Sequence, residues 1–360
     1  MRKVFLPTTE YVKVLGRTLM LDDCRLLCTS GSGVEFSYTG SRLAVTFLGD
    51  DSTNCDGDVL HWRDLARVQV IIDGYVMLDT SIKNAKETYV VYGEDPSWPV
   101  ATHTVRIVKL SEPRMSSVGL GEIEIEADGM PKPTENKAKF VEFIGDSITC
   151  GYGVDTENEL CPFSTCTENA TKAYAYLASK ELDIDYSLVS YSGHGLVSGW
   201  TPDSNVPKKE ELLQPYYEIV AYSYNTFRGI KPQDYDWSFD RKPDIIVINL
   251  GTNDFSYTQD VQSKIEEYKN CYKQFLNQVR AKNLDAHIIC TLGVMGDDLY
   301  PAVEQVVEEY KELTGDVNIN AMHFTPQNPE LDGLSADYHP SQITQKKAAK
   351  EMVAELKKWL

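Results

Sequence analysis

Hydrophobic and polar residues alternate with a period of two through the first third of the chain. The alternation runs through five short segments, at residues 34–38, 43–47, 68–72, 105–107 and 123–125. Between two apolar runs lies Asp73-Gly74, a dipeptide that is typical of a two-residue hairpin turn. Strands of this pattern bury one face and leave the other in water. We therefore predict an antiparallel β-sandwich domain over residues 1–130, with a jelly roll as its topology.

The pattern changes near residue 130. Residues 130–137 contain two prolines and no apolar periodicity, which predicts a linker at 131–139. Beyond it, short apolar runs alternate with segments of helical spacing. Strands are predicted at 140–144, 187–191, 244–250, 287–292 and 317–324, and helices at 173–182, 261–279, 302–313 and 342–360. Repeated strand–helix units predict a parallel sheet covered by helices on both faces, so residues 140–360 form an α/β/α domain.

Composition narrows the class of partner. The formal net charge is −19, which argues against nucleic-acid binding and against docking on anionic membranes, and which is compatible with a neutral substrate. The chain opens with Arg2-Lys3, but its first apolar stretch ends at Pro7, too soon for a signal peptide. We therefore expect a cytoplasmic protein. The oligomeric state, including a homo-oligomer, stays open.

The eight cysteines are Cys24, Cys28, Cys55, Cys150, Cys161, Cys166, Cys271 and Cys290. None has the Cys-x-x-Cys or cysteine–histidine spacing of a zinc site, so no metal site is predicted. In a chain without a leader, we expect reduced and mostly buried thiols. In an exported protein, Cys161 and Cys166 are the pair close enough in sequence to bridge.

Four polar segments stand at predicted strand ends or just before a helix. They are Gly145-Asp146-Ser147, Ser192-Gly193-His194-Gly195, Gly251-Thr252-Asn253-Asp254 and Ser335-Ala336-Asp337-Tyr338-His339-Pro340. In open α/β sheets, the chemistry is found where the strands end. Each segment alone has an ordinary explanation as a cap or a turn. All four together, in one α/β half, indicate a shared site.

Acyl transfer needs the residue types that these segments supply. A serine hydroxyl becomes a nucleophile when a histidine takes its proton, and a carboxylate commonly orients that histidine. The oxyanion that forms needs N–H donors from the backbone or from an amide side chain. Ser147, His339, Asp337, Gly193 and Asn253 can fill these roles between them.

The motifs around Ser147, Gly193, Asn253 and His339 closely resemble those of the SGNH, or GDSL-like, hydrolase superfamily over roughly residues 140–360. The whole chain resembles carbohydrate esterase family 2 more narrowly, because that family places a jelly roll before the SGNH domain. In the wider superfamily the acid usually lies three residues before the histidine, where this chain has Ala336. Here the acid, Asp337, lies two residues before it, as in family 2.

The resemblance implies roles for these residues. Ser147 is the nucleophile, His339 is the general base and then the acid, and Asp337 orients His339. The N–H groups of Ser147 and Gly193 and the side chain of Asn253 form the oxyanion hole. Some family 2 members orient the histidine through a backbone carbonyl instead, so the part played by Asp337 stays open. No metal or organic cofactor is implied.

The predicted function is therefore a carbohydrate O-acetyl esterase of the acetyl xylan esterase type, acting on acetylated xylo- or other oligosaccharides as in xylan degradation. Trp200, Tyr152 and Tyr191 lie near the motif loops, and aromatic faces stack well on sugar rings. Trp200 has a second interpretation, as a residue that packs the two domains together. Two alternatives remain for the function. One is an SGNH esterase, lipase or thioesterase for a non-sugar ester, and the other is a non-catalytic carbohydrate-binding protein.

Overall fold

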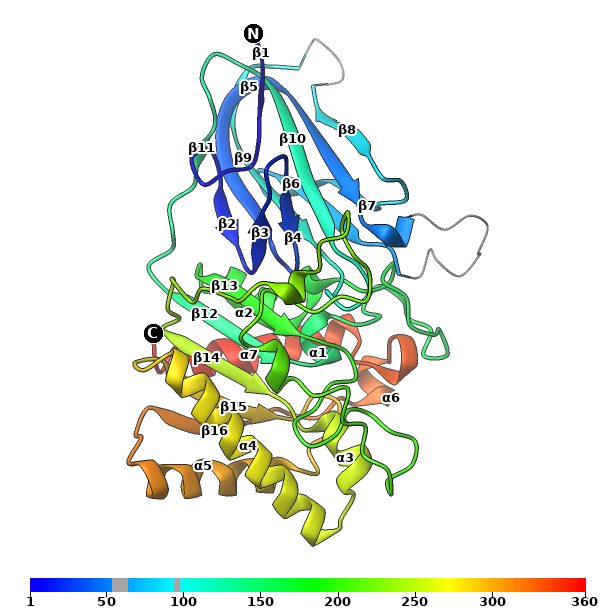
Figure 1. Cartoon of the computed structure of the whole chain (residues 1–360), viewed down its shortest axis with the longest axis vertical. Helices are drawn as coiled ribbons and strands as arrows, with labels where there is room; N and C mark the ends of the chain where they lie inside the picture. Colours follow the sequence, from blue (N-terminus) through cyan, green and yellow to red (C-terminus); the bar gives the residue numbers. More distant parts are fainter. Residues whose placement is uncertain (54–63, 94–97) are drawn as a thin grey trace. The chain divides into compact units, whose positions relative to one another are not determined.

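The computed structural model describes residues 1–53, 64–93 and 98–360, which divide into two compact units (Figure 1). The first, here called the β unit, contains Met1–Asn136, Ser164–Glu168 and Ile219–Asp236. The second, the α/β unit, contains Lys137–Phe163, Asn169–Glu218 and Trp237–Leu360. The linear domain boundaries expected from the sequence omit the two later segments that the structure assigns to the β unit.

The β unit is built from antiparallel strands. They are β1 (Arg2–Phe5), β2 (Lys13–Leu15), β3 (Thr18–Met20), β4 (Arg25–Leu27), β5 (Gly33–Gly49), β6 (Arg67–Ile72), β7 (Tyr75–Ser81), β8 (Glu87–Tyr92), β9 (Ala101–Lys109), β10 (Val118–Ala127) and β11 (Lys132–Pro133). Strand β11 pairs with β5, so part of the predicted linker belongs to the sandwich.

Strand β5 is the central strand of this antiparallel sheet. Its residues 33–40 pair with β9, and its residues 40–49 pair with β10. The first half also receives β2, and the second half receives β8. The apolar residues of the alternating pattern point into one core, which includes Val34, Phe36, Val45, Phe47, Val70, Ile107 and Ile123. The period of two thus specifies the buried face, as predicted from the sequence.

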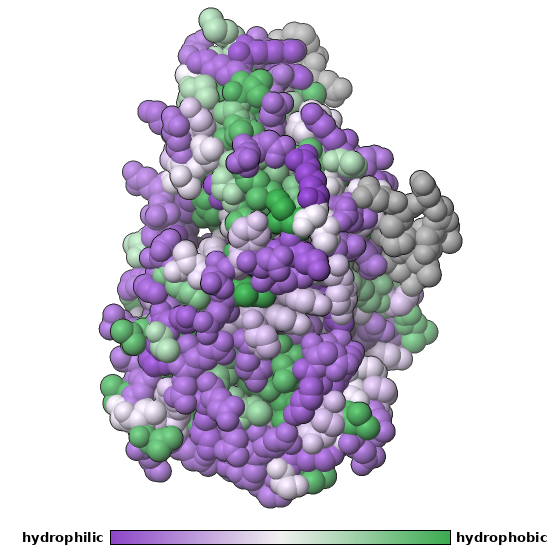
Figure 2. All heavy atoms as spheres, viewed as in Figure 1, coloured by the Kyte–Doolittle hydropathy of each residue, from purple (hydrophilic) through white to green (hydrophobic). Residues whose placement is uncertain are grey.

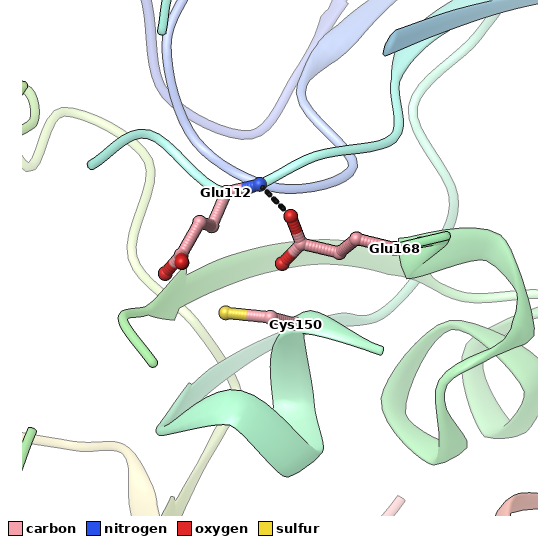
Figure 3. A group of neighbouring side chains, drawn as sticks. All are labelled: Glu112, Cys150 and Glu168. Carbon is pink, nitrogen blue, oxygen red and sulfur yellow. Dashed lines mark hydrogen bonds between the residues drawn. The ribbon is translucent and has the colours of Figure 1, made fainter. Parts of the chain in front are cut away.

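The segment Ser164–Glu168 is held in the β unit by hydrogen bonds to its strands and loops. The carboxylate of Glu168 accepts a hydrogen bond of 2.9 Å from the backbone N–H of Glu112 (Figure 3). Arg67 on β6 donates to the backbone carbonyls of Cys166 and Glu168. These polar contacts explain why a short stretch from the middle of the chain belongs to the sandwich, although its own sequence has no strand pattern.

The α/β unit contains a parallel sheet in the order β13-β12-β14-β15-β16 (Figure 1). Its strands are β12 (Phe140–Gly145), β13 (Asp185–Ser190), β14 (Ile245–Asn249), β15 (His287–Leu292) and β16 (Ile319–His323). Its α-helices are α1 (Ser147–Cys150), α2 (Tyr174–Glu181), α3 (Thr252–Thr258), α4 (Gln262–Lys282), α5 (Tyr300–Thr314), α6 (Pro329–Asp332) and α7 (Gln342–Leu356).

Helices α2 and α7 share one core with the sheet. Residues of β12 and β14 meet those of both helices there, among them Val141, Phe143, Val247, Tyr174 and Met352. The alternate strand residues Ile246, Ile248 and Ile288 are also fully buried, so the other face of the sheet is covered as well. Helices α4 and α5 pack against each other, and α5 packs on β15 and β16. The short continuous apolar runs of the sequence are those of strands buried on both faces.

The predicted fold class, an antiparallel β domain followed by an α/β domain with a parallel sheet, is confirmed. Among the described cysteines, Cys24, Cys28, Cys150 and Cys290 are buried thiols, and Cys161, Cys166 and Cys271 are free and partly exposed. Cys55 lies outside the described residues. In the described ranges, no helix combines the length and apolar character needed to cross a membrane. Hydrophilic side chains cover most of the face seen in Figure 2, as the net charge leads one to expect.

Candidate active site

Ser147 lies at the carboxyl end of a central strand, where β12 gives way to α1. Between the two stands Asp146, whose extended backbone and side chain cap the helix: its Oδ1 accepts the N–H of Ile148 at 3.0 Å. Ser147 is therefore the first residue of α1, where backbone N–H groups have no partner within the helix. The hydroxyl and the backbone N–H of Ser147 therefore stand together at the start of the helix, as an acyl-transfer site requires.

His339 approaches this hydroxyl from the other end of the chain. Its Nε2 lies 2.9 Å from the Oγ of Ser147. Its Nδ1 lies 3.1 Å from the carbonyl oxygens of both Ala336 and Asp337. Because a carbonyl can only accept a hydrogen bond, Nδ1 carries the proton and Nε2 is left as the acceptor for the hydroxyl of Ser147. This is the tautomer that a general base needs.

The backbone just before His339 adopts an unusual conformation. In the 3-10 helix η6 (Ala336–Tyr338), Asp337 and Tyr338 have φ angles of 49° and 61°, a left-handed region that non-glycine residues seldom occupy. The two turns direct the carbonyls of Ala336 and Asp337 at the imidazole. Backbone strain of this kind persists only where the surrounding structure enforces it.

The carboxylate of Asp337 does not contact His339. It accepts a hydrogen bond of 2.6 Å from the hydroxyl of Tyr152. Of the two possibilities that the sequence left open for Asp337, the hydrogen bonds favour the one in which its backbone carbonyl, and not its carboxylate, orients His339. Residue type alone could not distinguish orientation by the carboxylate from orientation by the backbone carbonyl, because residue type does not specify the direction of a carbonyl.

Burial of the imidazole lowers the pKa of His339 to about 4, and the two carbonyls and the charge of Asp337 only partly oppose this shift. A desolvated imidazole avoids the charged form. The ring therefore stays neutral, and able to accept a proton, well below the usual pKa of a histidine.

Asn253 and Gly193 come from two other segments of the site, the start of α3 and the loop after β13. Asn253 is the second residue of α3, and its Nδ2 donates to the carbonyl of His194 at 2.9 Å and to Oδ2 of Asp146 at 3.2 Å. Gly193 has a φ of 77°, and its carbonyl accepts the N–H of Trp200 at 2.8 Å. The hydrogen bonds of Asn253 thus link the glycine loop, α3 and the cap of the serine helix.

Asp254, the last residue of the third polar segment, is fully buried. Its Oδ1 accepts the backbone N–H groups of Leu196, Val197 and Ser198 at 2.8, 2.6 and 3.2 Å. A Cβ at Gly195 would lie 2.6 Å from Oδ2, so only glycine fits beside this carboxylate. Asp254 therefore fixes the loop that follows Gly193. In the sequence, only the position of Asp254 next to Asn253 indicated that Asp254 has a role in the site.

Two buried carboxylates give this region its electrostatics. Burial raises the pKa of Asp146 to about 7, and the charge of Asp254 adds to that shift. Burial likewise raises the pKa of Asp254 to about 6, although three backbone N–H groups oppose it. Both groups therefore change charge near neutral pH, within hydrogen-bond reach of the loops that hold Ser147 and Asn253.

The three aromatic residues predicted to bind substrate have different environments. Trp200 is 56% exposed, and its backbone is bound to Gly193. Tyr191 is fully buried against His194 and Tyr216, so its prediction as a substrate contact is wrong. Tyr152 is only 7% exposed and lies flat on His339, so it is not an open sugar platform either. Proximity along the chain could not reveal which rings face inward.

Two further features of the site bear on the sequence prediction. Tyr338, next to His339, is 52% exposed and is a second open aromatic ring, besides Trp200, among the residues of the motif loops, although nothing in the sequence sets it apart. His194 is buried, and its Nδ1 donates to the carbonyl of Ser192, which fits a structural role.

Family models match both parts of the chain. Residues 141–352 match the GDSL-like lipase/acylhydrolase family, and residues 14–134 match the carbohydrate esterase 2 N-terminal domain. The first match spans more than half of the chain, and the two regions meet where the pattern of the sequence changes.

Two characterised proteins are similar over nearly the whole chain. A cellulase/esterase, CelE, of Acetivibrio thermocellus is 28% identical over 339 residues, which are 91% of this chain and 37% of that protein. The chain thus spans little more than a third of that relative. An acetylxylan esterase/glucomannan deacetylase of Cellvibrio japonicus is 26% identical over 96% of this chain and 88% of its own length.

Solved structures show the same fold. A family two carbohydrate esterase from Clostridium thermocellum, in complex with cellohexaose, has a TM-score of 0.81 at 25% identity and covers 97% of this chain and 100% of that one. The acetyl xylan esterase Est2A of Butyrivibrio proteoclasticus has a TM-score of 0.83 at 21% identity, with coverages of 99% and 98%.

Proposed function

Because the chain belongs to the GDSL-like lipase and acylhydrolase family, we propose that it is a serine esterase that removes acetyl groups from carbohydrate. The observation that carries this proposal is the contact of 2.9 Å between Nε2 of His339 and Oγ of Ser147, with Nδ1 already held by two carbonyls. A serine paired with a neutral, oriented imidazole is an activated nucleophile.

The reaction proceeds in two halves. Oγ of Ser147 attacks the acetyl carbonyl carbon while Nε2 of His339 takes the hydroxyl proton. The N–H groups of Ser147 and Gly193 stabilise the oxyanion, and Nδ2 of Asn253 joins them by giving up one of its two present hydrogen bonds, to His194 or to Asp146. His339 then gives its proton to the departing sugar oxygen, and the acetyl group stays on Ser147. In the second half, His339 activates a water that attacks this acyl-enzyme, and acetate leaves.

Carbohydrate as the substrate class is supported from two directions. The relative from Cellvibrio japonicus is named an acetylxylan esterase/glucomannan deacetylase, and one solved neighbour holds cellohexaose. In this chain, Trp200 presents an exposed ring beside the glycine loop, and the C–H faces of sugars stack on such rings. The high negative charge also suits a neutral substrate.

The decisive experiment measures acetate release from a panel of acetylated xylo-, gluco- and manno-oligosaccharides. Wild-type protein should release acetate, and Ser147→Ala should lower turnover by about a millionfold, as loss of the nucleophile does in serine hydrolases. Fluorophosphonate labelling of wild type but not of Ser147→Ala checks the nucleophile independently. Unchanged turnover in Ser147→Ala would remove the serine from the mechanism.

Two other outcomes would redirect the proposal. A preference for long-chain over acetyl nitrophenyl esters would favour a lipid substrate. Absence of both labelling and turnover in folded protein would favour a non-catalytic carbohydrate-binding protein.

A further inference from the structure

Tyr152 makes two different contacts with the segment that carries His339. Its ring is stacked on the imidazole, with centroids 3.9 Å apart and planes 19° from parallel. Its hydroxyl donates to Oδ2 of Asp337 at 2.6 Å. The same Asp337 offers its backbone carbonyl to Nδ1 of His339. One tyrosine therefore contacts the base directly and also holds the residue that orients it.

The loop after α1 is fitted closely to η6 around these contacts. A Cβ at Gly153 would lie 2.4 Å from the Cβ of Ala336, so the backbones approach as closely as glycine allows. The N–H of Asp337 donates to the carbonyl of Cys161 at 3.2 Å. The ring of Phe163 packs against Tyr152 at 5.0 Å. The left-handed turns of η6 are thus held from outside by this loop.

We propose that Tyr152 is the positioning residue of the catalytic base, with its ring fixing the imidazole plane and its hydroxyl fixing Asp337. This inference rests on the proposed esterase function. A side-chain carboxylate normally both orients the histidine and stabilises the imidazolium. Here two neutral carbonyls take the orienting contact, and the face of an aromatic ring lies where it attracts a cation.

Among the residues that the structure describes, the ionisable groups that face His339 are Asp337 on η6 and Tyr152 on the loop after α1. The charge of Asp337 raises the pKa of His339, but burial dominates and lowers it. The ring of Tyr152 covers one face of the imidazole. Removing that ring should therefore admit water and bring the pKa of His339 back towards its usual value.

The test compares Tyr152→Leu, Tyr152→Phe and Asp337→Asn on nitrophenyl acetate. Tyr152→Leu should lower kcat by about tenfold or more with KM little changed, since a stacked ring contributes about that much. It should also move the acid limb of the kcat/KM profile to higher pH.

Tyr152→Phe keeps the ring, and its kcat should fall by only about threefold, the effect of one hydrogen bond. Asp337→Asn keeps an acceptor for the tyrosine and should also stay within about threefold, against about ten thousandfold for loss of a triad carboxylate.

Phe163→Leu is the matched control, because Phe163 packs behind Tyr152. It should lower thermal stability and leave the acid limb of the kcat/KM profile at the same pH.

The proposal is overturned if Tyr152→Leu keeps kcat and the acid limb of wild type, if Phe163→Leu shifts that limb equally, or if Asp337→Asn loses as much activity as removal of a triad carboxylate does. Should Tyr152→Leu not fold, Tyr152→Phe and Asp337→Asn still decide it. The rate of fluorophosphonate labelling reports on His339 even if no acetyl ester is turned over, so failure of the esterase proposal is distinguishable.

Discussion

The two sides of Ser147 are built by opposite means. On the oxyanion side, with Gly193, Asn253 and Asp254, a buried carboxylate gathers three backbone N–H groups and fixes a loop. On the base side, with Tyr152 and His339, two backbone carbonyls and an aromatic ring hold the imidazole, and the carboxylate of Asp337 is bonded to Tyr152 instead.

This difference follows from what each side must do. In the proposed mechanism the oxyanion side presents donors to a charge that appears only in the transition state, and the loop that Asp254 fixes helps to hold those donors in place beforehand. The base side has to pass a proton in both directions, so its imidazole must stay neutral in the free enzyme. Neutral acceptors and burial keep it so, and the pKa of His339 falls to about 4.

Removing Asn253 should break the oxyanion side most severely. Asn253→Ala should lower kcat for acetyl ester hydrolysis by about a hundredfold to a thousandfold, the usual effect of losing one oxyanion donor. Steady-state kinetics measure this, and thermal unfolding shows whether the fold is kept. A change of less than about twofold would mean that Asn253 only caps the neighbouring loop through its bond to His194.

Asp254 tests whether the same side depends on a fixed loop. Asp254→Ala leaves three buried N–H groups without their acceptor, which should cost about 3 kcal/mol or more of unfolding free energy and lower kcat as well.

Asp254→Asn is the control, because its amide oxygen can accept the same bonds without a buried charge. The raised pKa of Asp254 means that ionisation opposes folding as the pH rises from its ordinary value of 3.8 through about 6. Above that pH, Asp254→Asn should be at least as stable as wild type by chemical denaturation. Equal loss in both variants would contradict this account.

The pH dependence of kcat/KM tests the base side, because it reports the protonation state of His339. His339 must be unprotonated to act, and its pKa is lowered from 6.5 to about 4, so kcat/KM should stay near its maximum down to about pH 5. An unshifted imidazole would lose about tenfold by pH 5.5.

Stopped assays with nitrophenyl acetate from pH 4 to 8 measure this profile. Asp146 and Asp254 also titrate near neutral pH, so the profile of Asp254→Asn separates their contribution. An acid limb at the usual histidine pKa in both proteins would contradict the assignment.

Substitution of Trp200 should have the smallest effect on catalysis, because Trp200 belongs to neither side of Ser147. Its side chain is largely exposed, so Trp200→Ala should leave thermal stability unchanged. KM for acetylated oligosaccharides should rise by up to about tenfold, the energy of one stacked ring, while kinetics on nitrophenyl acetate stay the same. Equal effects on both substrates would place Trp200 in the support of the glycine loop, through its bond to Gly193.

The sequence by itself determined the order of the two domains, the strands and helices of the parallel sheet, and the residues brought together at its carboxyl edge. Periodicity and motif position are local properties, and parallel strands carry their end loops to one edge whatever the details. The prediction of Ser147 beside His339 used this together with the chemistry of the four motifs and the resemblance that they carry, and the contact of 2.9 Å agrees with it.

Only the tertiary structure decided which atoms of those residues meet. The carbonyl of Asp337 rather than its carboxylate reaches His339, Tyr152 covers the base, Tyr191 is buried, and Asp254 holds a loop from a different strand. These outcomes depend on backbone dihedrals and on packing between segments far apart in the chain, such as the 185 residues that separate Tyr152 from Asp337. Residue type does not specify the direction in which a carbonyl or a ring faces, because neighbours from elsewhere in the fold set it.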